Sequence, residues 1–409
     1  MFRVVMLGNF SLFNKGTMRA RALPLARALV RRGHEVGLVL ASLDAPSAGG
    51  VVREEAGVRV QHVAPVGPTG WRQLAATAAL ARAAGQAEAD VVHAFKPIAY
   101  AGAAGALLTA AARLPGPRPR VVFDADDWEG TGGWADLDRR PAWQRWLIDR
   151  QERWNLRHCD GLTVASRQLA ALALALGAKQ EKVHYLPNGV EAVSGPPTVL
   201  ARAAARDRLG LGSSPIVLLY TRFAEYPVAQ VVRLLRQVVA VRPDVRLLVV
   251  GRGLRGEEKE LARSLAAASL QDSVLPAGWI EPESLPVYLT AADIAIYPFA
   301  DTLVNRTKCP AKLVELLAAG LPVVAERVGQ TGEYVVHGES GWLVPPGDES
   351  AFAEAVLTLL SDPAERQVLA QGAVARVAGS FLWDHLAGRA EAAYGAIASS
   401  KGGRRLAGA

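Results

Sequence analysis

A lysine and a glutamate stand close together at the start of a helix expected over residues 310–319. Pro310 suits the first turn because its missing N–H is not needed there, and Gly320 is a typical residue just past a helix end. Lys312 and Glu315 therefore lie on the early turns, where free amide groups and the helix dipole favour anions. This arrangement predicts a phosphate site beside a carboxylate that can accept hydrogen bonds from ribose hydroxyls.

Three aspartates lie at the end of an apolar run and just beyond it. The run covers residues 120–124 and is typical of a buried strand. Asp124, Asp126 and Asp127 would project where ligands of parallel sheets bind. An Asp-x-Asp pair could hold a divalent metal, and an aspartate could instead cap a helix ahead of Trp128. The third interpretation is catalysis or contact with an acceptor hydroxyl. The residues alone leave these three open.

Further candidates follow two expected strands of the second half. Arg222 comes just after residues 216–221, where a guanidinium can pair with phosphate oxygens, although a plain surface charge fits equally well. Gly253 belongs to a Gly-x-Gly-x-x-Gly run that formally matches a dinucleotide fingerprint. Because Asp272 precedes the next strand instead of ending it, we expect a tight strand-to-helix turn near a ligand.

The first half offers fewer chemical groups. Gly16 and Thr17 lie in the first loop, where a missing Cβ permits close approach of a ligand, and the alternative is a loop without function. His93 lies near the end of a strand with Lys96 close by. A lone histidine in such a place is more often structural than catalytic.

These residues belong to a chain in which apolar strand signals alternate with helical segments, which predicts parallel sheets covered on both faces. The expected strands are residues 2–7, 34–41, 58–63, 90–95, 120–124, 160–165, 182–186, 216–221, 245–250, 274–276, 293–297 and 321–325.

The length of 409 residues suits two domains. A shift to Pro, Gly, Ser and Ala over residues 195–214 predicts a linker with a short helical piece. We therefore predict a Rossmann-like domain over 1–195, a second over 213–380, and a helix at 381–398 that rejoins the first. Residues 399–409 are expected to form a flexible basic tail.

The composition limits the class of protein. Half of the residues are apolar and the formal net charge is +7, which fits a folded protein with a phosphorylated, nucleic-acid or membrane partner. Cys159 and Cys309 cannot form a disulfide framework or a metal cluster, and the start of the chain does not resemble a secretory signal. The longest apolar run, 98–112, is too short to span a bilayer. We expect a cytoplasmic protein.

A basic segment over residues 139–157 interleaves tryptophans with six arginines on an expected helix. For Trp143, Trp146 and Trp154 we expect burial in the core, with the arginines in solvent. The alternative is peripheral contact with an anionic membrane, which would be its inner face. No nucleic-acid module is recognisable, so nucleic acid is not expected as a partner.

Together, several segments resemble the large retaining family of GT-B glycosyltransferases that includes sucrose synthase-like and mannosyltransferase-like enzymes. The resemblance covers nearly the whole chain, and the order and spacing of its segments are strongly specific. Those segments read CDGLTVASRQLA, KVHYLPNGVE, VRLLVVGRG, AGWIEPESLPVYLTAADIAIYPF and KLVELLAAGLPVVAERVGQTGEYVVHGESGWLVPPGD. The resemblance implies two Rossmann-like domains facing an interdomain cleft.

The resemblance also implies site residues. Glu315 is similar to the ribose-binding glutamate and Arg222 to the diphosphate arginine, while Asp126 or Asp127 falls near a loop in which the family usually offers a histidine. The acceptor is expected on the first domain, with Gly16, Thr17 and His93 on its side, and His93 resembles a strand-end histidine common in that domain. The remaining implied donor contacts are the backbone amides of Leu313 and Val314, and Trp279 and Ile280 beside the base.

Three departures from the family pattern stand out. Thr307 occupies the place of the first of two glutamates, the one that contacts the sugar. No lysine follows Arg222 closely, so Lys308 or Lys312 is expected to supply that charge. The third departure is aspartate in place of the loop histidine.

The expected function is metal-independent, retaining transfer of a sugar from a nucleotide-diphosphate donor to an acceptor hydroxyl, with no cofactor. A catalytically silent partner subunit and a sugar-nucleotide epimerase on the same fold are the alternatives. The sequence does not specify the base, the sugar, the acceptor or the oligomeric state.

Overall fold

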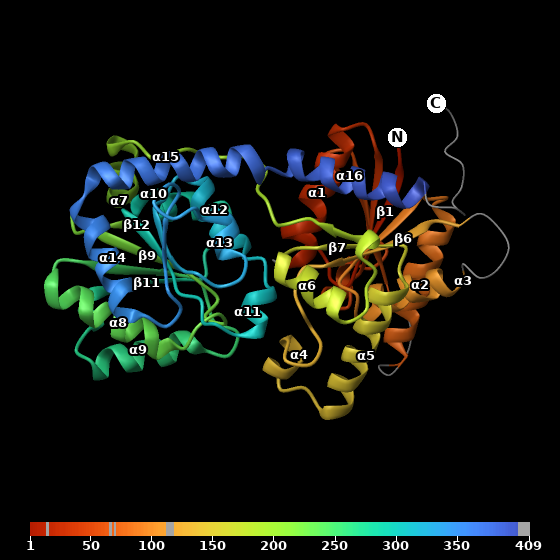
Figure 1. Cartoon of the computed structure of the whole chain (residues 1–409), viewed down its shortest axis with the longest axis horizontal. Coiled ribbons are helices and arrows are strands. Elements are labelled where there is room, and N and C mark those ends of the chain that lie inside the picture. The colour runs from red at the N-terminus through yellow and green to blue at the C-terminus, as the bar shows by residue number, and fades with distance from the viewer. Residues whose placement is uncertain (14–15, 65–67, 69–70, 112–117, 400–409) are drawn as a thin grey trace. The chain divides into compact units, whose positions relative to one another are not determined.

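The computed structural model describes residues 1–13, 16–64, 68, 71–111 and 118–399 (Figure 1). The chain divides into two compact units. Unit 1 is formed by Met1–Glu191, Thr307–Cys309 and the C-terminal part from Trp383, and unit 2 by Ala192–Arg306 and Pro310–Leu382. Each unit is built on its own sheet, so the predicted α/β fold with two parallel-sheet domains is confirmed.

Unit 1 contains an eight-stranded sheet in the order β3-β4-β2-β1-β5-β6-β7-β8. All neighbours are parallel except β3 and β4. The strands are β1 Arg3–Gly8, β2 Glu35–Ala41, β3 Val52–Glu55, β4 Val58–Val63, β5 Val91–Phe95, β6 Arg120–Ala125, β7 Gly161–Val164 and β8 Val183–Tyr185.

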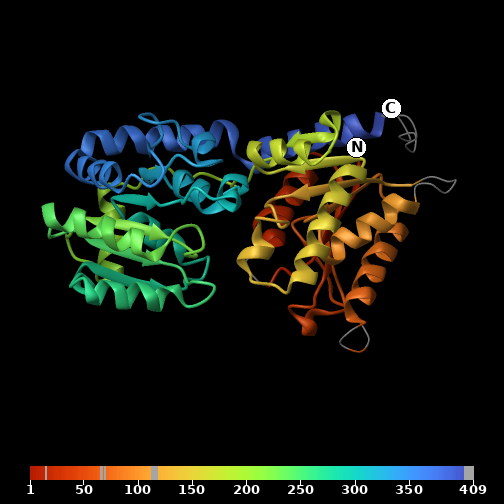
Figure 2. The same cartoon turned by 60° about the horizontal axis from the view of Figure 1, so that its bottom comes forward.

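Helices cover both faces of this sheet, as alternate residues of β1 show. Val4 and Met6 belong to one buried apolar cluster, and Val5 and Leu7 to another. The helices are η1 Met18–Ala22, α1 Leu23–Arg31, η2 Pro46–Ala48, α2 Arg72–Gln86, α3 Ala99–Ala111, α4 Trp134–Leu137, α5 Ala142–His158, α6 Arg167–Ala175, η3 Gln180–Lys182 and α16 Trp383–Ser399. In both views α16 lies beside α1 (Figures 1 and 2), and Arg31 pairs with Asp384 at 2.7 Å.

Unit 2 has six parallel strands in the order β11-β10-β9-β12-β13-β14. If the strands of the unit are numbered from 1, this is the 3-2-1-4-5-6 order of a doubly wound sheet. The order in which the chain adds strands reverses between β9 and β12. The strands are β9 Ile216–Tyr220, β10 Arg246–Val250, β11 Val274–Gly278, β12 Ile294–Tyr297, β13 Val323–Glu326 and β14 Trp342–Val344.

Helices connect the strands of unit 2, and α12 agrees with the helix expected over residues 310–319. The helices are α7 Val199–Leu209, α8 Val228–Val241, α9 Glu257–Ala267, η4 Gln271–Ser273, α10 Leu285–Ala291, α11 Leu303–Thr307, α12 Ala311–Ala318, α13 Thr331–Tyr334, α14 Glu349–Ser361 and α15 Pro363–Ser380. The segment interpreted as a linker is largely the helix α7, which Arg206 ties to Asp293 at 2.6 Å. The flexible tail was predicted to begin at residue 399. Ser399 is instead the last residue of α16, and residues 400–409 lie outside the described residues.

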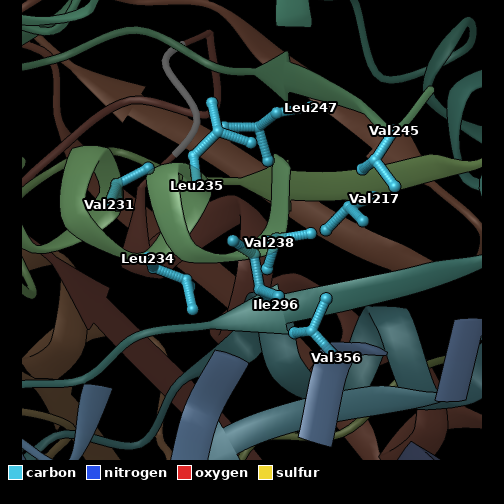
Figure 3. A pocket seen from close by; sticks show the side chains of 9 residues that line it. All are labelled: Val217, Val231, Leu234, Leu235, Val238, Val245, Leu247, Ile296 and Val356. Carbon is cyan, nitrogen blue, oxygen red and sulfur yellow. The ribbon is translucent and has the colours of Figure 1, made fainter. Parts of the chain in front are cut away.

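The core of unit 2 contains a hollow with a wholly apolar lining between α8 and the sheet (Figure 3). Its walls are Val217, Val231, Leu234, Leu235, Val238, Val245, Leu247, Ile296 and Val356. Because no lining residue offers a charge or a hydrogen bond, this hollow does not suit a nucleotide. The polar residues that could hold one lie elsewhere in the unit.

Candidate active site

The reversal of strand order in unit 2 predicts a ligand crevice at the carboxyl ends of β9 and β12. A second hollow lies there, and its lining is rich in polar and aromatic residues. Tyr220 ends β9 and Tyr297 ends β12, and Lys312 joins them from the first turn of α12. The full lining is Leu219, Tyr220, Thr221, Glu225, Tyr226, Tyr297, Pro298 and Lys312.

Lys312 and Tyr220 line this hollow, and Glu315 contacts Tyr220 beside it. The Lys312 ammonium nitrogen lies 3.8 Å from the centre of the Tyr220 ring, a close cation–π contact. The Tyr220 hydroxyl hydrogen-bonds to Glu315, and burial together with the Glu315 carboxylate raises the pKa of Tyr220. Tyr220 therefore stays neutral at pH 7. Lys312 and Glu315 stand three residues apart on α12, as predicted, so one helical turn presents a cation and a carboxylate side by side.

The other predicted donor residues follow neighbouring strands at the same edge of the sheet. Arg222 is exposed after β9, Gly253 follows β10, and Trp279, 48% exposed, follows β11 together with Ile280. Parallel strands end at a common edge, which brings these residues to one side of unit 2. The Gly253 amide donates to Glu258 at 3.0 Å, which shows the tight turn that the glycines predicted.

Leu313 and Val314, whose backbone amides the resemblance implies as donor contacts, lie in α12. The side chains of Leu313 and Val314 are completely buried, so only their backbone could meet a ligand. The Leu313 amide already donates to the Pro310 carbonyl at 3.2 Å. Because this N–H is engaged in the first turn of α12, it is a poor candidate for a diphosphate contact.

In unit 1, Lys96 and a group of carboxylates meet beyond the ends of β5 and β6. The Lys96 ammonium nitrogen lies 2.5 Å from Glu129, 3.3 Å from Asp126 and 3.7 Å from Asp127. Thr17 donates to Asp126 at 2.6 Å, which brings the first loop into the same cluster. The cluster thus brings together residues that are far apart in the sequence, namely Thr17, Lys96, Asp126 and Asp127.

The two neighbouring aspartates differ in their protonation. Burial raises the pKa of both, but for Asp126 the Lys96 ammonium and the Thr17 hydroxyl outweigh it and lower the pKa. For Asp127, burial prevails over Lys96, and with the repulsion of Asp126 it raises the pKa to about 6. Asp126 is therefore ionised at pH 7, whereas Asp127 titrates just below neutrality.

The two candidate lysines belong to different environments. Lys308 lies in the part of the chain that clusters with unit 1, where its ammonium nitrogen is 5.2 Å from the centre of the Trp134 ring. Its charge also lowers the pKa of Asp127. Lys308 therefore belongs to the carboxylate cluster, and of the two lysines only Lys312 lies in the hollow of unit 2.

Three interpretations are wrong in the structure. No helix begins at Trp128 within the described residues, since the next helix is α4, so the aspartates are not its cap. His93 is not accessible to an acceptor, because it is completely buried and its ring nitrogens contact Tyr394 at 2.8 Å and Thr163 at 3.0 Å. Burial lowers the pKa of His93 to about 4, which leaves the ring neutral. The tryptophans of α5 are not in the core, as described below.

Gly16 lies two residues before the start of η1, and its carbonyl accepts hydrogen bonds from the Arg19 and Ala20 amides of that turn. An added Cβ at Gly16 would meet nothing within 4 Å, so space alone does not require glycine there. Within the described part of the chain, no group of three or more His, Cys, Asp or Glu residues could hold a metal ion.

Sequence reasoning missed a buried, hydrogen-bonded polar group of unit 1. Arg21 is buried and donates to both oxygens of Asp124 at 2.7 Å, and also to Asn188 at 3.0 Å and the Leu186 carbonyl at 2.7 Å. Thr163 completes the set by donating to Asp124 at 2.7 Å. This pair anchors β6 directly before Asp126. The only signal in the sequence was an arginine among the apolar residues of the first helical stretch.

The described residues include no helix that is long and apolar enough to cross a membrane.

Comparison with known proteins identifies the family of the chain. The model of "Glycosyl transferases group 1" matches residues 214–362, and that of "Glycosyl transferase 4-like domain" matches residues 16–189. A D-inositol 3-phosphate glycosyltransferase from Xylanimonas cellulosilytica is 30% identical over 91% of this chain and 89% of its own length. The chain belongs to the group 1 family of glycosyltransferases.

Two further relatives are matched over part of their length. A D-inositol 3-phosphate glycosyltransferase from Acidothermus cellulolyticus is 34% identical over 54% of this chain, a match that spans about half (48%) of the relative. A GDP-mannose-dependent alpha-(1-6)-phosphatidylinositol monomannoside mannosyltransferase from Mycolicibacterium smegmatis is 30% identical over 70% of this chain and 75% of the relative.

Solved structures share the fold. Sucrose-phosphate synthase from Thermosynechococcus elongatus superposes with a TM-score of 0.73 at 22% identity, covering 96% of this chain and 98% of the other. Anabaena HepE in complex with UDP has a TM-score of 0.72 at 19% identity, covering 95% and 98%. These likenesses define the GT-B fold.

Proposed function

We propose that the protein transfers a sugar from a nucleotide-diphosphate donor to an acceptor hydroxyl, with retention of configuration and without a required metal ion. The observation that carries the proposal is the group of Lys312, Tyr220 and Glu315 at the carboxyl ends of β9 and β12. A cation and a carboxylate on one helical turn suit a diphosphate and a ribose respectively. Family membership supports the same assignment.

In this proposal the residues of unit 2 bind the donor and stabilise its departure. Negative charge builds up on the diphosphate as the sugar leaves, so preorganised cations lower the barrier most. Arg222 and Lys312 supply those cations, and Lys312 takes the place of the lysine that does not follow Arg222. Glu315 binds the ribose, held by the Tyr220 hydroxyl. Trp279 and Ile280 lie beside the base.

The carboxylate cluster of unit 1 binds the sugar or the acceptor in this proposal. Lys96 neutralises the charge of ionised Asp126, whereas the Asp127 carboxyl group can gain or lose a proton near pH 6. Asp127 accepts a hydrogen bond from a sugar hydroxyl, in the role that the family gives to a histidine. The departing phosphate takes the proton of the acceptor on the same face, so no protein base is needed.

A ligand screen tests the donor assignment. UDP, GDP, UDP-glucose and GDP-mannose should be compared by thermal shift, because similar proteins carry UDP, UDP-glucose and GDP-mannose in their names. A ligand at 100 times its dissociation constant stabilises the folded protein by about 2.7 kcal/mol. A nucleotide that raises Tm in the wild type and not in Glu315→Ala supports the site. If none of the four raises Tm, the donor assignment is wrong.

Catalysis needs its own measurement. Enzyme-dependent release of the nucleotide diphosphate in the presence of EDTA supports a metal-independent transferase. Binding of a nucleotide sugar without its turnover, over a broad set of acceptors, would favour the silent partner subunit instead. This alternative is motivated by Thr307, which replaces the sugar-contacting glutamate and is buried in the structure.

The protonation of Asp127 predicts the pH dependence. Its pKa of about 6 means that the carboxyl is protonated below pH 6 and ionised above it. If ionised Asp127 accepts the hydrogen bond, kcat/KM should rise through pH 6 and level off above it. Asp127→Asn should lower the plateau and abolish this rise, whereas Asp138→Asn, on the exposed surface of unit 1, should keep it. A rise near pH 6 that persists in Asp127→Asn assigns it to another group.

A further inference from the structure

Helix α5 presents three tryptophans to solvent. Trp143 is 64% exposed, Trp146 62% and Trp154 37%, and Leu147 between them is 51% exposed. These positions follow the i, i+3, i+4 and i+11 spacing of a single helical stripe. In both views α5 lies on the outside of unit 1 (Figures 1 and 2). Large apolar residues gathered on one exposed helix face commonly mark an interaction surface.

The opposite face of α5 is fixed to the body of unit 1, so the helix cannot turn its tryptophans inward. Glu152, Asn155 and Leu156 are buried. The Asn155 amide donates to the Pro97 carbonyl at 2.8 Å, and Glu152 accepts from the Glu129 amide at 3.2 Å. The exposure of the tryptophans is therefore a consequence of how α5 is anchored.

Arginines share the outward stripe with the tryptophans. Arg150 lies with its guanidinium 5.3 Å from the centre of the Trp146 ring, and Arg157 is exposed one turn beyond Trp154. Neither arginine pairs with a carboxylate among the described residues. Of the two acidic residues of α5, Glu152 is buried and Asp149 is held by Arg153 at 2.6 Å, so the stripe carries no negative charge.

We infer that this stripe, formed by Trp143, Trp146, Leu147, Arg150, Trp154 and Arg157, docks unit 1 on the headgroup layer of an anionic lipid bilayer. Arginines stand beside the apolar residues of the stripe, so a partner must be apolar and negatively charged at the same depth. The boundary between headgroups and acyl chains has that property, and tryptophan rings and arginine stems suit it. Basic residues near an anionic leaflet add electrostatic attraction.

This surface is independent of the proposed donor site, which lies in unit 2. The stripe variants should therefore bind nucleotides like the wild type. A stripe variant that binds nucleotides but not membranes shows that the membrane surface and the donor site are separate. A wild-type protein that binds membranes but no nucleotide would contradict the donor site alone.

Cosedimentation with vesicles tests the inference. The wild-type protein should bind vesicles of phosphatidylcholine and phosphatidylglycerol in equal amounts, and bind pure phosphatidylcholine weakly. Because each basic residue near the surface contributes about 1 kcal/mol, Arg150→Glu with Arg157→Glu should weaken binding by at least about tenfold. Raising the salt from about 0.1 M to 1 M should weaken wild-type binding as well, since the Debye length falls from about 10 to 3 Å.

The apolar contribution is tested by Trp143→Ser with Trp146→Ser, which should weaken vesicle binding and reduce the blue shift of tryptophan emission on anionic vesicles. Matched controls are Trp71→Ser, 65% exposed on unit 1, and Arg236→Glu, exposed on α8 of unit 2. Both controls should bind vesicles like the wild type. Circular dichroism should show that all variants are folded.

Two results would overturn the inference. Equal binding of wild type and stripe variants to anionic vesicles would place the membrane contact elsewhere. The other is self-association in solution that the stripe variants abolish, without any binding to vesicles. That result would make the stripe an interface between copies of this chain.

Discussion

Replacement of Arg222 by alanine should lower kcat by about two to three orders of magnitude, the typical cost of removing one preorganised group that stabilises transition-state charge. Arg222 is exposed two residues after Tyr220, which ends β9 and whose pKa the charge of Arg222 lowers. In the proposed reaction its guanidinium meets the leaving diphosphate, where charge grows as the sugar departs. The measurement is steady-state release of nucleotide diphosphate, with the donor that the ligand screen identifies.

Arg236→Ala is the matched control for this experiment, because Arg236 is an exposed arginine of the same unit that lies on α8. It should retain wild-type kcat and KM. Glu315→Gln provides a contrast, since loss of a ribose contact made equally in the ground and transition states raises KM while kcat stays nearly unchanged. Wild-type kcat in a folded Arg222→Ala protein would remove Arg222 from the catalytic assignment.

The strands of both sheets were largely predictable because strands buried on both faces of a parallel sheet have short runs of apolar, β-branched residues in the sequence. The two strands that were missed lack this signature. β3, Val52–Glu55, is an exposed antiparallel edge strand with three charged residues. β14, Trp342–Val344, has only three residues. Neither has enough buried alternating positions to be recognised by periodicity.

Parts of the site encoded within a few residues were also predictable. The first turn of α12 with Lys312 and Glu315 could be derived from Pro310, Gly320 and the spacing between them. The contact of Lys312 with Tyr220 could not, because it joins residues 92 positions apart, 312 minus 220. Such pairs depend on which strands become neighbours, and local patterns do not record this.

The prediction for α5 failed for a different reason. Tryptophan is usually buried, and the expectation assumed that apolar residues choose the inward face of a helix. Here the inward positions belong to Glu152 and Asn155, which satisfy backbone groups of neighbouring loops. Polar anchoring can thus override apolar periodicity, and it leaves the tryptophans of α5 exposed.

The ion pair between Arg21 and Asp124 leads to the largest expected effect on stability. Burial alone would lower the pKa of Arg21, but Asp124 raises it, so Arg21 stays charged inside unit 1. Asp124→Ala leaves the Arg21 charge buried without its counterion, which typically costs about 3–5 kcal/mol. Glu35→Ala is the control, since its pair with Arg3 is exposed and worth about 1 kcal/mol or less.

Urea unfolding followed by tryptophan fluorescence can measure this difference in unit 1. Seven of the nine tryptophans lie there, all except Trp279 and Trp342, so the signal reports mainly on that unit. Removing both charges in Arg21→Met with Asp124→Leu should recover part of the lost free energy of unfolding, because no uncompensated charge is then buried. If the double variant were no more stable than Asp124→Ala, the hydrogen bonds of Arg21 to Asn188 and Leu186 would contribute more than the ion pair itself. Such a result would identify Arg21 chiefly as the group that ties the end of β8 to η1.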